Sequence, residues 1–281
     1  MAHVFVAPHP DDVALSCGGL VARLRERGEN VAVLTLFSGT GEAGRLTPYQ
    51  REALGFGSGS GLRDADAAAE AMALRRLEDE RFAAFAGVST VLLGLPDAVF
   101  RGYVGDDQLL GDPRADDPAP VAALRRELAR LARDGLGPER LYCPMGIGRH
   151  VDHQLAREAG LALLAEQPEG PLPFASWVGR VAFYEDFPYA HRGGFGGLAD
   201  LPAGAFAALP GGVALRGELT DVAAVLERKV GGIAQYASQM DRLFGGAGPM
   251  AEAVRAYAAR VAAAGSVASG AAERVWVAAG G

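Results

Sequence analysis

The stretch from Val4 to Gly19, VFVAPHPDDVALSCGG, decides the fold of this chain. Its first four residues form an uninterrupted apolar run, which is typical of a strand buried on both faces in a parallel sheet. A polar turn follows, and the apolar pattern of residues 14–27 then predicts a helix that ends at Gly28. Strand, turn and helix in this order begin a βαβ unit, so the sequence predicts an α/β fold.

The same alternation of apolar runs and helical patterns continues along the chain. Glycine and proline become more frequent beyond about residue 188, and the periodicity weakens there. We therefore predict a single domain over residues 1–281. It consists of a three-layer α/β core of about residues 1–190, with a mostly parallel sheet, and a C-terminal helical extension of about residues 191–281. The predicted strands are residues 4–7, 31–37, 91–95, 141–143, 181–184 and 274–277, and the predicted helices are residues 14–27, 65–85, 120–133, 151–164, 220–238 and 251–263.

Composition narrows the class of protein. Of the 281 residues, 49% are hydrophobic, which supplies a large core and excludes disorder as the main state. No stretch approaches the roughly 20 apolar residues of a membrane span, and the first residues lack the basic region of a signal peptide. The net charge of −7 argues against a nucleic-acid or anionic-membrane partner. We expect a soluble, cytoplasmic protein.

Two cysteines, Cys17 and Cys143, are too few for a disulfide framework or a four-thiolate zinc site. Cys17, next to two glycines, is expected to be a small buried residue at the start of a helix. Lys229 is the only lysine, which we interpret as codon bias because arginine is abundant.

Polar side chains gather after the predicted strands, where an open parallel sheet binds its ligands. His9 and Asp12 follow the first strand, and His150 and His153 follow the fourth. The chain has five histidines, and three of them thus lie at these two strand ends. Imidazole and carboxylate ligands suit Zn²⁺ with one position open for water. Each pair alone could equally be a turn or a capped helix start. Together, at two strand ends of one sheet, they predict a metal site.

These motifs resemble those of the PIG-L/LmbE-like deacetylases. The resemblance is densest before residue 155 and extends over roughly residues 3–240. The residues that carry it are His9-Pro10-Asp11-Asp12, Ser16-Cys17-Gly18-Gly19, Arg75-Arg76-Leu77-Glu78, Leu93-Gly94-Leu95-Pro96-Asp97, His150-Val151-Asp152-His153-Gln154, Tyr184-Glu185-Asp186-Phe187-Pro188-Tyr189 and Tyr236-Ala237-Ser238-Gln239.

The resemblance implies a Rossmann-like sheet and a metal-dependent hydrolase that removes N-acetyl groups, mostly from glucosamine-type amides. It implies Zn²⁺ as the metal, with Fe²⁺ or another divalent ion compatible with the same ligands. Its roles carry over as follows: His9, Asp12 and His153 as metal ligands, Asp11 as general base, and His150, oriented and kept protonated by Asp152, as the group that assists the oxyanion or the leaving amine.

The chain departs from that family at two places. Val13 stands where the family often has glutamate, which leaves the expected ligands and base intact. Gly146, Ile147 and Gly148 stand where some branches carry a tyrosine that assists the oxyanion. We expect that assistance to come from elsewhere or to be missing.

The residues that would bind substrate have two interpretations each. Arg75 and Arg76 either form a solvated salt-bridge face or reach a sugar hydroxyl or a phosphate. Asp97 either holds sugar hydroxyls, which we favour, or terminates a turn. Glu185 and Asp186 either line the crevice or belong to a solvated loop. The glycine-rich run of residues 55–61 lacks the spacing of a nucleotide loop and is interpreted as a lid.

Three functions fit these observations. The first is a metal-dependent amide hydrolase that acts on a small amino-sugar-type substrate, without nucleic acid or membrane as partner. The second is a non-catalytic module of the same fold that binds a metal or a sugar, and the third is a metal-dependent phosphoesterase, which would usually need more carboxylates. Neither the exact substrate nor the oligomeric state can be predicted from the sequence.

Overall fold

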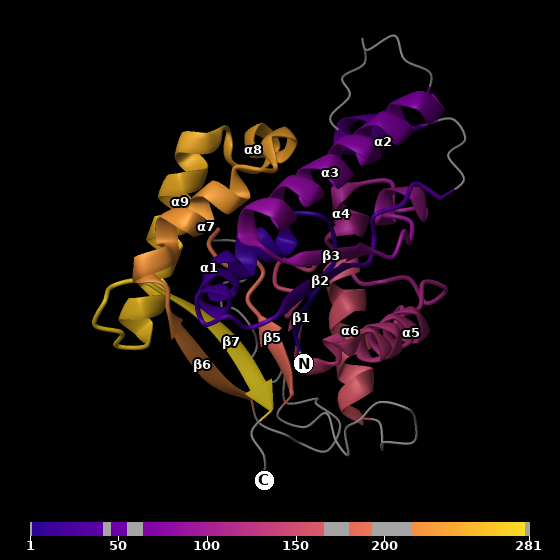
Figure 1. Cartoon of the computed structure of the whole chain (residues 1–281). Helices are drawn as coiled ribbons and strands as arrows, with labels where there is room; N and C mark the ends of the chain where they lie inside the picture. The colour runs from indigo at the N-terminus through magenta and orange to yellow at the C-terminus, as the bar shows by residue number, and fades with distance from the viewer. Residues whose placement is uncertain (1, 42–45, 55–63, 166–179, 193–214, 279–281) are drawn as a thin grey trace.

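Seven strands of the described chain form one sheet in the order β3-β2-β1-β4-β5-β7-β6 (Figure 1). The computed structural model describes residues 2–41, 46–54, 64–165, 180–192 and 215–278. The strands β3, β2, β1, β4 and β5 run parallel, whereas β7 is antiparallel to both β5 and β6. The strand bounds are β1 Ala2–Ala7, β2 Val31–Thr35, β3 Ser89–Leu92, β4 Pro138–Pro144, β5 Val181–Tyr184, β6 Leu215–Asp221 and β7 Ala272–Ala278.

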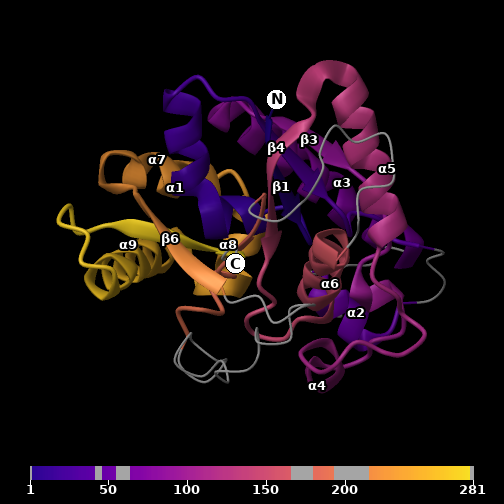
Figure 2. The same cartoon turned by 90° about the horizontal axis from the view of Figure 1, so that it is seen from below.

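Helices cover both faces of the sheet, which makes the three layers that the sequence predicts. Helix α1 packs on β1 and β2 together with α3 and α7, while α6 packs on β4 and β5 together with α5. Figure 2 shows α5 and α6 across the sheet from α1 and α7. The helix bounds are α1 Asp12–Glu26, α2 Pro48–Ala53, α3 Asp64–Ala86, α4 Asp106–Leu109, α5 Val121–Leu131, α6 Val151–Ala165, α7 Leu226–Ile233, α8 Ala237–Phe244 and α9 Ala247–Ala264.

The centre of the sheet explains where a site can form. Val4, Phe5 and Val6 on β1 are fully buried, because helices cover this strand on both faces. The chain order reverses between β1 and β4: β2 and β3 continue on one side of β1, and β5 follows on the far side of β4. The connections after these two strands diverge to opposite faces and leave a crevice at their carboxyl ends.

The predicted C-terminal extension is only partly helical. Its strands β6 and β7 lengthen the sheet, α7 packs on α1, and α9 packs on α7, α8 and β7 (Figure 1). The prediction of one helix over residues 220–238 is wrong. Residues 215–221 form the edge strand β6, which pairs with β7 along its whole length, and a turn at residues 234–236 separates α7 from α8. All residues of β6 are exposed or half-buried and most are polar or glycine, so the strand has no apolar run that would predict it.

Three further predictions concern the cysteines, the glycine-rich segment and membrane-spanning helices. Cys17 and Cys143 are both free and buried, as expected of small core residues. The predicted lid of residues 55–61 lies outside the described residues. Among the described helices, none combines the length and the apolar character needed to cross a bilayer.

Candidate metal and active site

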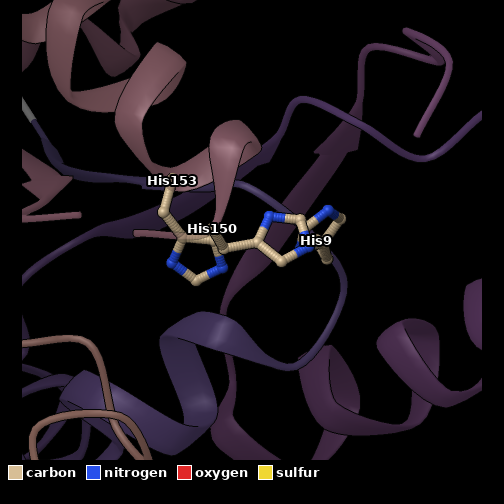
Figure 3. Close-up of side chains that lie close together, drawn as sticks. All are labelled: His9, His150 and His153. Atoms are coloured by element: carbon tan, nitrogen blue, oxygen red, sulfur yellow. The ribbon is translucent and has the colours of Figure 1, made fainter. Parts of the chain in front are cut away.

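The two histidine motifs meet in the crevice between β1 and β4. His9 lies in the turn between β1 and α1, while His150 and His153 lie at the start of α6. Figure 3 shows the three imidazole rings gathered at one point, and their centroids are 4.9 to 5.5 Å apart. One ring nitrogen from each lies within 4.8 Å of the others. Residues more than 140 positions apart in the sequence are thus brought together, as predicted.

Asp12 joins two of these histidines. Its Oδ2 lies 3.4 Å from His9 Nδ1 and 3.4 Å from His153 Nε2. Ligand bonds of 2.0–2.1 Å in a tetrahedral zinc site separate neighbouring ligand atoms by about 3.3–3.4 Å. The spacing of these side chains therefore fits one small divalent ion, and their chemistry, two imidazoles and one carboxylate, suits zinc or iron(II).

The other nitrogen of each of these histidines is held by a fully buried carboxylate. His9 Nε2 is 2.8 Å from Asp152 Oδ2, and His153 Nδ1 is 2.7 Å from Asp186 Oδ1. Such pairing fixes the tautomer of a metal-binding histidine, so that the opposite nitrogen carries the lone pair. The nitrogens left for a metal are His9 Nδ1 and His153 Nε2, the same two that face Asp12.

Arg101 anchors Asp152 from behind the site. Its guanidinium donates to Asp152 Oδ1 at 2.5 Å and also makes three hydrogen bonds to Asp117. Arg101 could not be predicted from the sequence, because it lies in a loop where nothing in the pattern distinguishes it from a solvated arginine.

Asp152 contacts His150 through its backbone and not, as expected, through its carboxylate. The Asp152 carboxylate is directed to His9 and Arg101, and only the Asp152 backbone N–H reaches His150, donating to Nδ1 at 3.2 Å. Burial, and then the neighbouring His9, hold the pKa of His150 well below its ordinary value. In the neutral form that this lowered pKa favours, His150 accepts at Nδ1 and carries its proton on Nε2, where it can donate one hydrogen bond.

The backbone conformation and the surroundings of Asp11 are typical of a catalytic carboxylate. It precedes α1 with φ at 95°, a conformation that non-glycine residues rarely adopt. Within the described residues its carboxylate makes no capping bond to the helix, so the capping alternative is wrong for Asp11. Burial and the adjacent Asp12 raise the pKa of Asp11 to about 8. A carboxylate with a raised pKa in a crevice is a candidate proton acceptor.

The predicted substrate residues divide into two groups. Arg75 and Asp97 line the cavity above His9: their side chains are 3.7 Å apart, and Arg75 donates to Gln239 at 3.2 Å. Asp97 also begins a short helical turn by accepting from the Val99 N–H, so its turn interpretation holds, and its binding of sugar hydroxyls stays a prediction. Arg76 is exposed and is not among the residues that line this cavity, so its role in substrate binding stays a prediction without support from the cavity.

The site opens into a cavity of about 280 Å³, and several of its walls were not predicted. Gln239 and Arg242 come from α8, and Arg192 from the segment after β5. Tyr189 also lines it, with its ring edge-on to His153 at 5.7 Å. A Cβ at Gly148 would lie 2.4 Å from Tyr189 Cγ. The Tyr189 ring therefore packs against Gly148, which belongs to the segment where some members of the family have a different tyrosine.

The loop interpretation of Glu185 and Asp186 is wrong, because both are buried. Only Asp186 serves the site, through His153. Glu185 instead accepts hydrogen bonds from Tyr257, Arg274 and Trp276 and joins β5 to the C-terminal region. The sequence could not show which of these two adjacent carboxylates faces the site, because both directly follow β5.

The sequence pattern of the PIG-L family, described as GlcNAc-PI de-N-acetylase, matches residues 4–164. This chain belongs to the PIG-L family. It is similar to two 2'-N-acetylparomamine deacetylases. That of Streptomyces fradiae is 32% identical over 240 residues, covering 85% of this chain and 73% of the relative. That of Niallia circulans is 30% identical over 205 residues, covering 67% of each.

A solved structure confirms the PIG-L fold. The zinc-inhibited form of a teicoplanin deacetylase superposes with a TM-score of 0.69 at 23% identity, covering 98% of this chain and 97% of the other. The α/β class and the family predicted from the motifs are thus confirmed, and the relatives identify an N-deacetylase as the class of enzyme.

Proposed function

We propose that this PIG-L chain is a metal-dependent N-deacetylase that hydrolyses an acetyl or similar small acyl amide on an amino sugar or sugar conjugate. One observation carries the proposal. Asp12 Oδ2 lies 3.4 Å from His9 Nδ1 and 3.4 Å from His153 Nε2, and the adjacent Asp11 carboxylate makes no capping hydrogen bond to α1. A ligand set and a free base at one point are the two parts that amide hydrolysis by water requires.

The proposed metal ligands are His9, Asp12 and His153. A divalent ion held there would supply Lewis acidity, which polarises the amide carbonyl and makes water more acidic. Zinc is the first choice, and Fe²⁺ suits the same donors. The geometry of the three side chains supports one ion. Asp97 and Asp152 also lie close to His9, but Arg101 donates to Asp152 and the Arg75 guanidinium is 3.7 Å from Asp97, so these two carboxylates face arginines of the chain.

The remaining site residues have roles that follow from their bonds. Asp11 accepts the proton of the attacking water and can pass it to the leaving amine, consistent with its raised pKa. His150, neutral and protonated on Nε2, donates a hydrogen bond to the developing oxyanion rather than a full charge. Asp152 and Asp186 keep His9 and His153 in the orientation for binding.

The cavity favours a substrate with one sugar ring at the catalytic end. Asp97 and Arg75 place a carboxylate and a guanidinium at its wall, which suit sugar hydroxyls. The named relatives act on N-acetylparomamine, an acetylated amino-sugar compound, and this supports the same substrate class here.

The test is a screen of N-acetylated amino sugars, including 2'-N-acetylparomamine, with purified protein loaded with Zn²⁺ or Fe²⁺. Both ions are titrated, because a deacetylase of this fold is known in a zinc-inhibited form. We expect release of acetate from at least one compound. Asp11→Asn should abolish release while the ion stays bound. Retention of metal without amide hydrolysis across a broad acyl-amine panel would contradict the proposal.

A further inference from the structure

The two carboxylates that orient the proposed histidine ligands, Asp152 and Asp186, are both fully buried but are held in different ways. Asp186 accepts a hydrogen bond from the backbone N–H of Ile147 at 2.8 Å. Asp152 accepts from the backbone N–H of Ala98 at 3.1 Å and from a side chain, the guanidinium of Arg101, at 2.5 Å. A backbone donor is fixed by the fold, whereas a side-chain donor needs support of its own. The position of Asp152 therefore depends on what holds Arg101.

Every nitrogen of the Arg101 guanidinium is hydrogen-bonded. Nε and Nη2 donate to the Asp117 carboxylate at 2.9 to 3.1 Å, Nη2 also donates to Asp152, and Nη1 donates to the Pro96 carbonyl at 2.6 Å. The guanidinium carbon lies 4.6 Å from the centroid of the Phe37 ring, which covers one face of the group. Since a guanidinium is planar and rigid, these contacts fix one orientation, in which it points at Asp152.

This contact bears directly on the His9 ligand. Asp152 Oδ2 lies 2.8 Å from His9 Nε2, which leaves His9 Nδ1 facing Asp12. Loss of Arg101 would leave a buried charge that turns toward other donors, and the His9 ring would then lose its fixed hydrogen-bond partner. A metal site tolerates little such movement, because its ligand bonds have a narrow range of lengths.

We propose that Arg101 is a positioning residue that sets the affinity of the site for its metal ion. It holds Asp152, and Asp152 holds His9 in the orientation for binding. The inference rests on the proposed function, in which His9 is a metal ligand. It also assigns a task to the segment between β3 and α5, which carries both Arg101 and Asp117 but no proposed ligand and not the proposed base.

The test compares Arg101→Met with Arg140→Met by calorimetric titration with Zn²⁺ and by thermal melting. Arg140 is a matched control, because it is half-buried, lies over the Tyr142 ring at 5.4 Å and donates to Glu218 at 2.6 Å. It lies near the amino end of β4, whereas the site is at the carboxyl end.

Both variants should melt at a lower temperature, because each leaves a carboxylate without its partner. Only Arg101→Met should raise the Kd for Zn²⁺, by about tenfold, the lower end of the range for residues that support a metal ligand. A wild-type Kd in folded Arg101→Met, or an equal rise in Arg140→Met, overturns the positioning role.

Arg101→Lys keeps the test possible where Arg101→Met does not fold, since it preserves the positive charge. An ammonium group cannot reproduce the fork of bonds to Asp117, the Pro96 carbonyl and Asp152. This variant should therefore still bind Zn²⁺ more weakly than the wild type. A wild-type Kd would show that the charge alone suffices, and would overturn the positioning role.

A double variant tests the route through Asp152. If Arg101 acts by holding Asp152, adding Arg101→Met to Asp152→Asn should raise the Kd no further than Asp152→Asn alone. Additive losses of affinity would overturn this route. Failure of the wild type to bind Zn²⁺ or to release acetate is a separate outcome, which overturns the proposed function itself.

Discussion

Helix α1 contacts two buried polar clusters that differ in how their charges are used. At its middle, Lys229 donates to Glu273 at 2.6 Å, and Glu273 also accepts from the backbone N–H groups of Gly19 and Leu20 at 2.9 and 2.6 Å. Lys229 reaches Ser16 O at 3.4 Å as well. A Cβ at Gly19 would lie 2.8 Å from Glu273 Oε1, so the glycine allows the carboxylate to approach.

The cluster at the start of α1 is built differently. Asp12 is shared by two histidines, and Asp11 has an uncapped carboxylate with a raised pKa. In the Lys229 cluster each charged group is paired with the opposite charge or hydrogen-bonded to the backbone, as a buried ion pair that stabilises the fold requires. In the site cluster the donors converge on a point between them, which is what a ligand needs. Lys229, the only lysine of the chain, thus ties α7 to α1 and β7.

The first prediction breaks the site cluster. Asp12→Ala removes the carboxylate common to both proposed histidine ligands. Substitution of a residue that only supports a metal ligand typically lowers activity or metal affinity by about 10- to 100-fold. Because Asp12 is itself a proposed ligand, we expect the deacetylation rate and the affinity for the ion to fall by more than about 100-fold. Calorimetric titration with Zn²⁺ measures the affinity. Wild-type metal affinity in this variant would contradict the proposed ligand set.

The second prediction breaks the Lys229 cluster. Lys229→Met leaves the Glu273 charge buried without its partner, so the free energy of unfolding should fall by about 3–5 kcal/mol. Adding Glu273→Gln should recover part of that loss, because no unpaired charge remains. Denaturant unfolding measures both, and the activity per folded molecule should stay near the wild-type value. A selective loss of activity at unchanged stability would assign Lys229 to the site.

The third prediction concerns the wall of the site at Tyr189. Gly148→Ala adds a Cβ against the Tyr189 ring at a residue with φ of 85°. We expect a loss of about 1–3 kcal/mol in stability and a fall in activity as the ring moves. Gly28→Ala is the matched control, since Gly28 has φ of 77° with nothing within 4 Å of the added Cβ. It should lose stability only; equal activity loss in both variants would argue against a role for the wall.

The smallest expected effect separates two neighbouring arginines. Arg75→Ala should raise KM by about tenfold, the value of one hydrogen bond to a charged group, because Arg75 lines the cavity next to Asp97. Arg76→Ala should leave KM and kcat unchanged, since Arg76 is exposed outside the cavity. Steady-state kinetics on the same substrate decide between them, and the reverse ranking would return Arg76 to the site.

Much of the fold could be predicted because its strands are apolar on both faces. The residues 181–184 match β5, and the runs at residues 4–7 and 141–143 lie within β1 and β4. Strand β6 could not be predicted, since it gains its stability from pairing with β7 more than 50 residues later rather than from its own pattern.

The candidate site was predictable where chemistry follows a strand directly, as at His9 and His153. The direction of a side chain was not. Asp152 was expected to hold His150, two residues away, but the fold turns its carboxylate to His9, which is 143 residues away in sequence. Gln239 and Arg242 reach the cavity only because α8 folds back over it, and a local pattern carries no such information.

The most direct test of the account measures bound metal and acetate release on one preparation, before and after chelation and during stepwise reloading. We expect activity to disappear with the ion and to return in proportion to it, with its maximum at one ion per chain. Full activity in the metal-free protein, or a maximum reached only at two ions per chain, would contradict it.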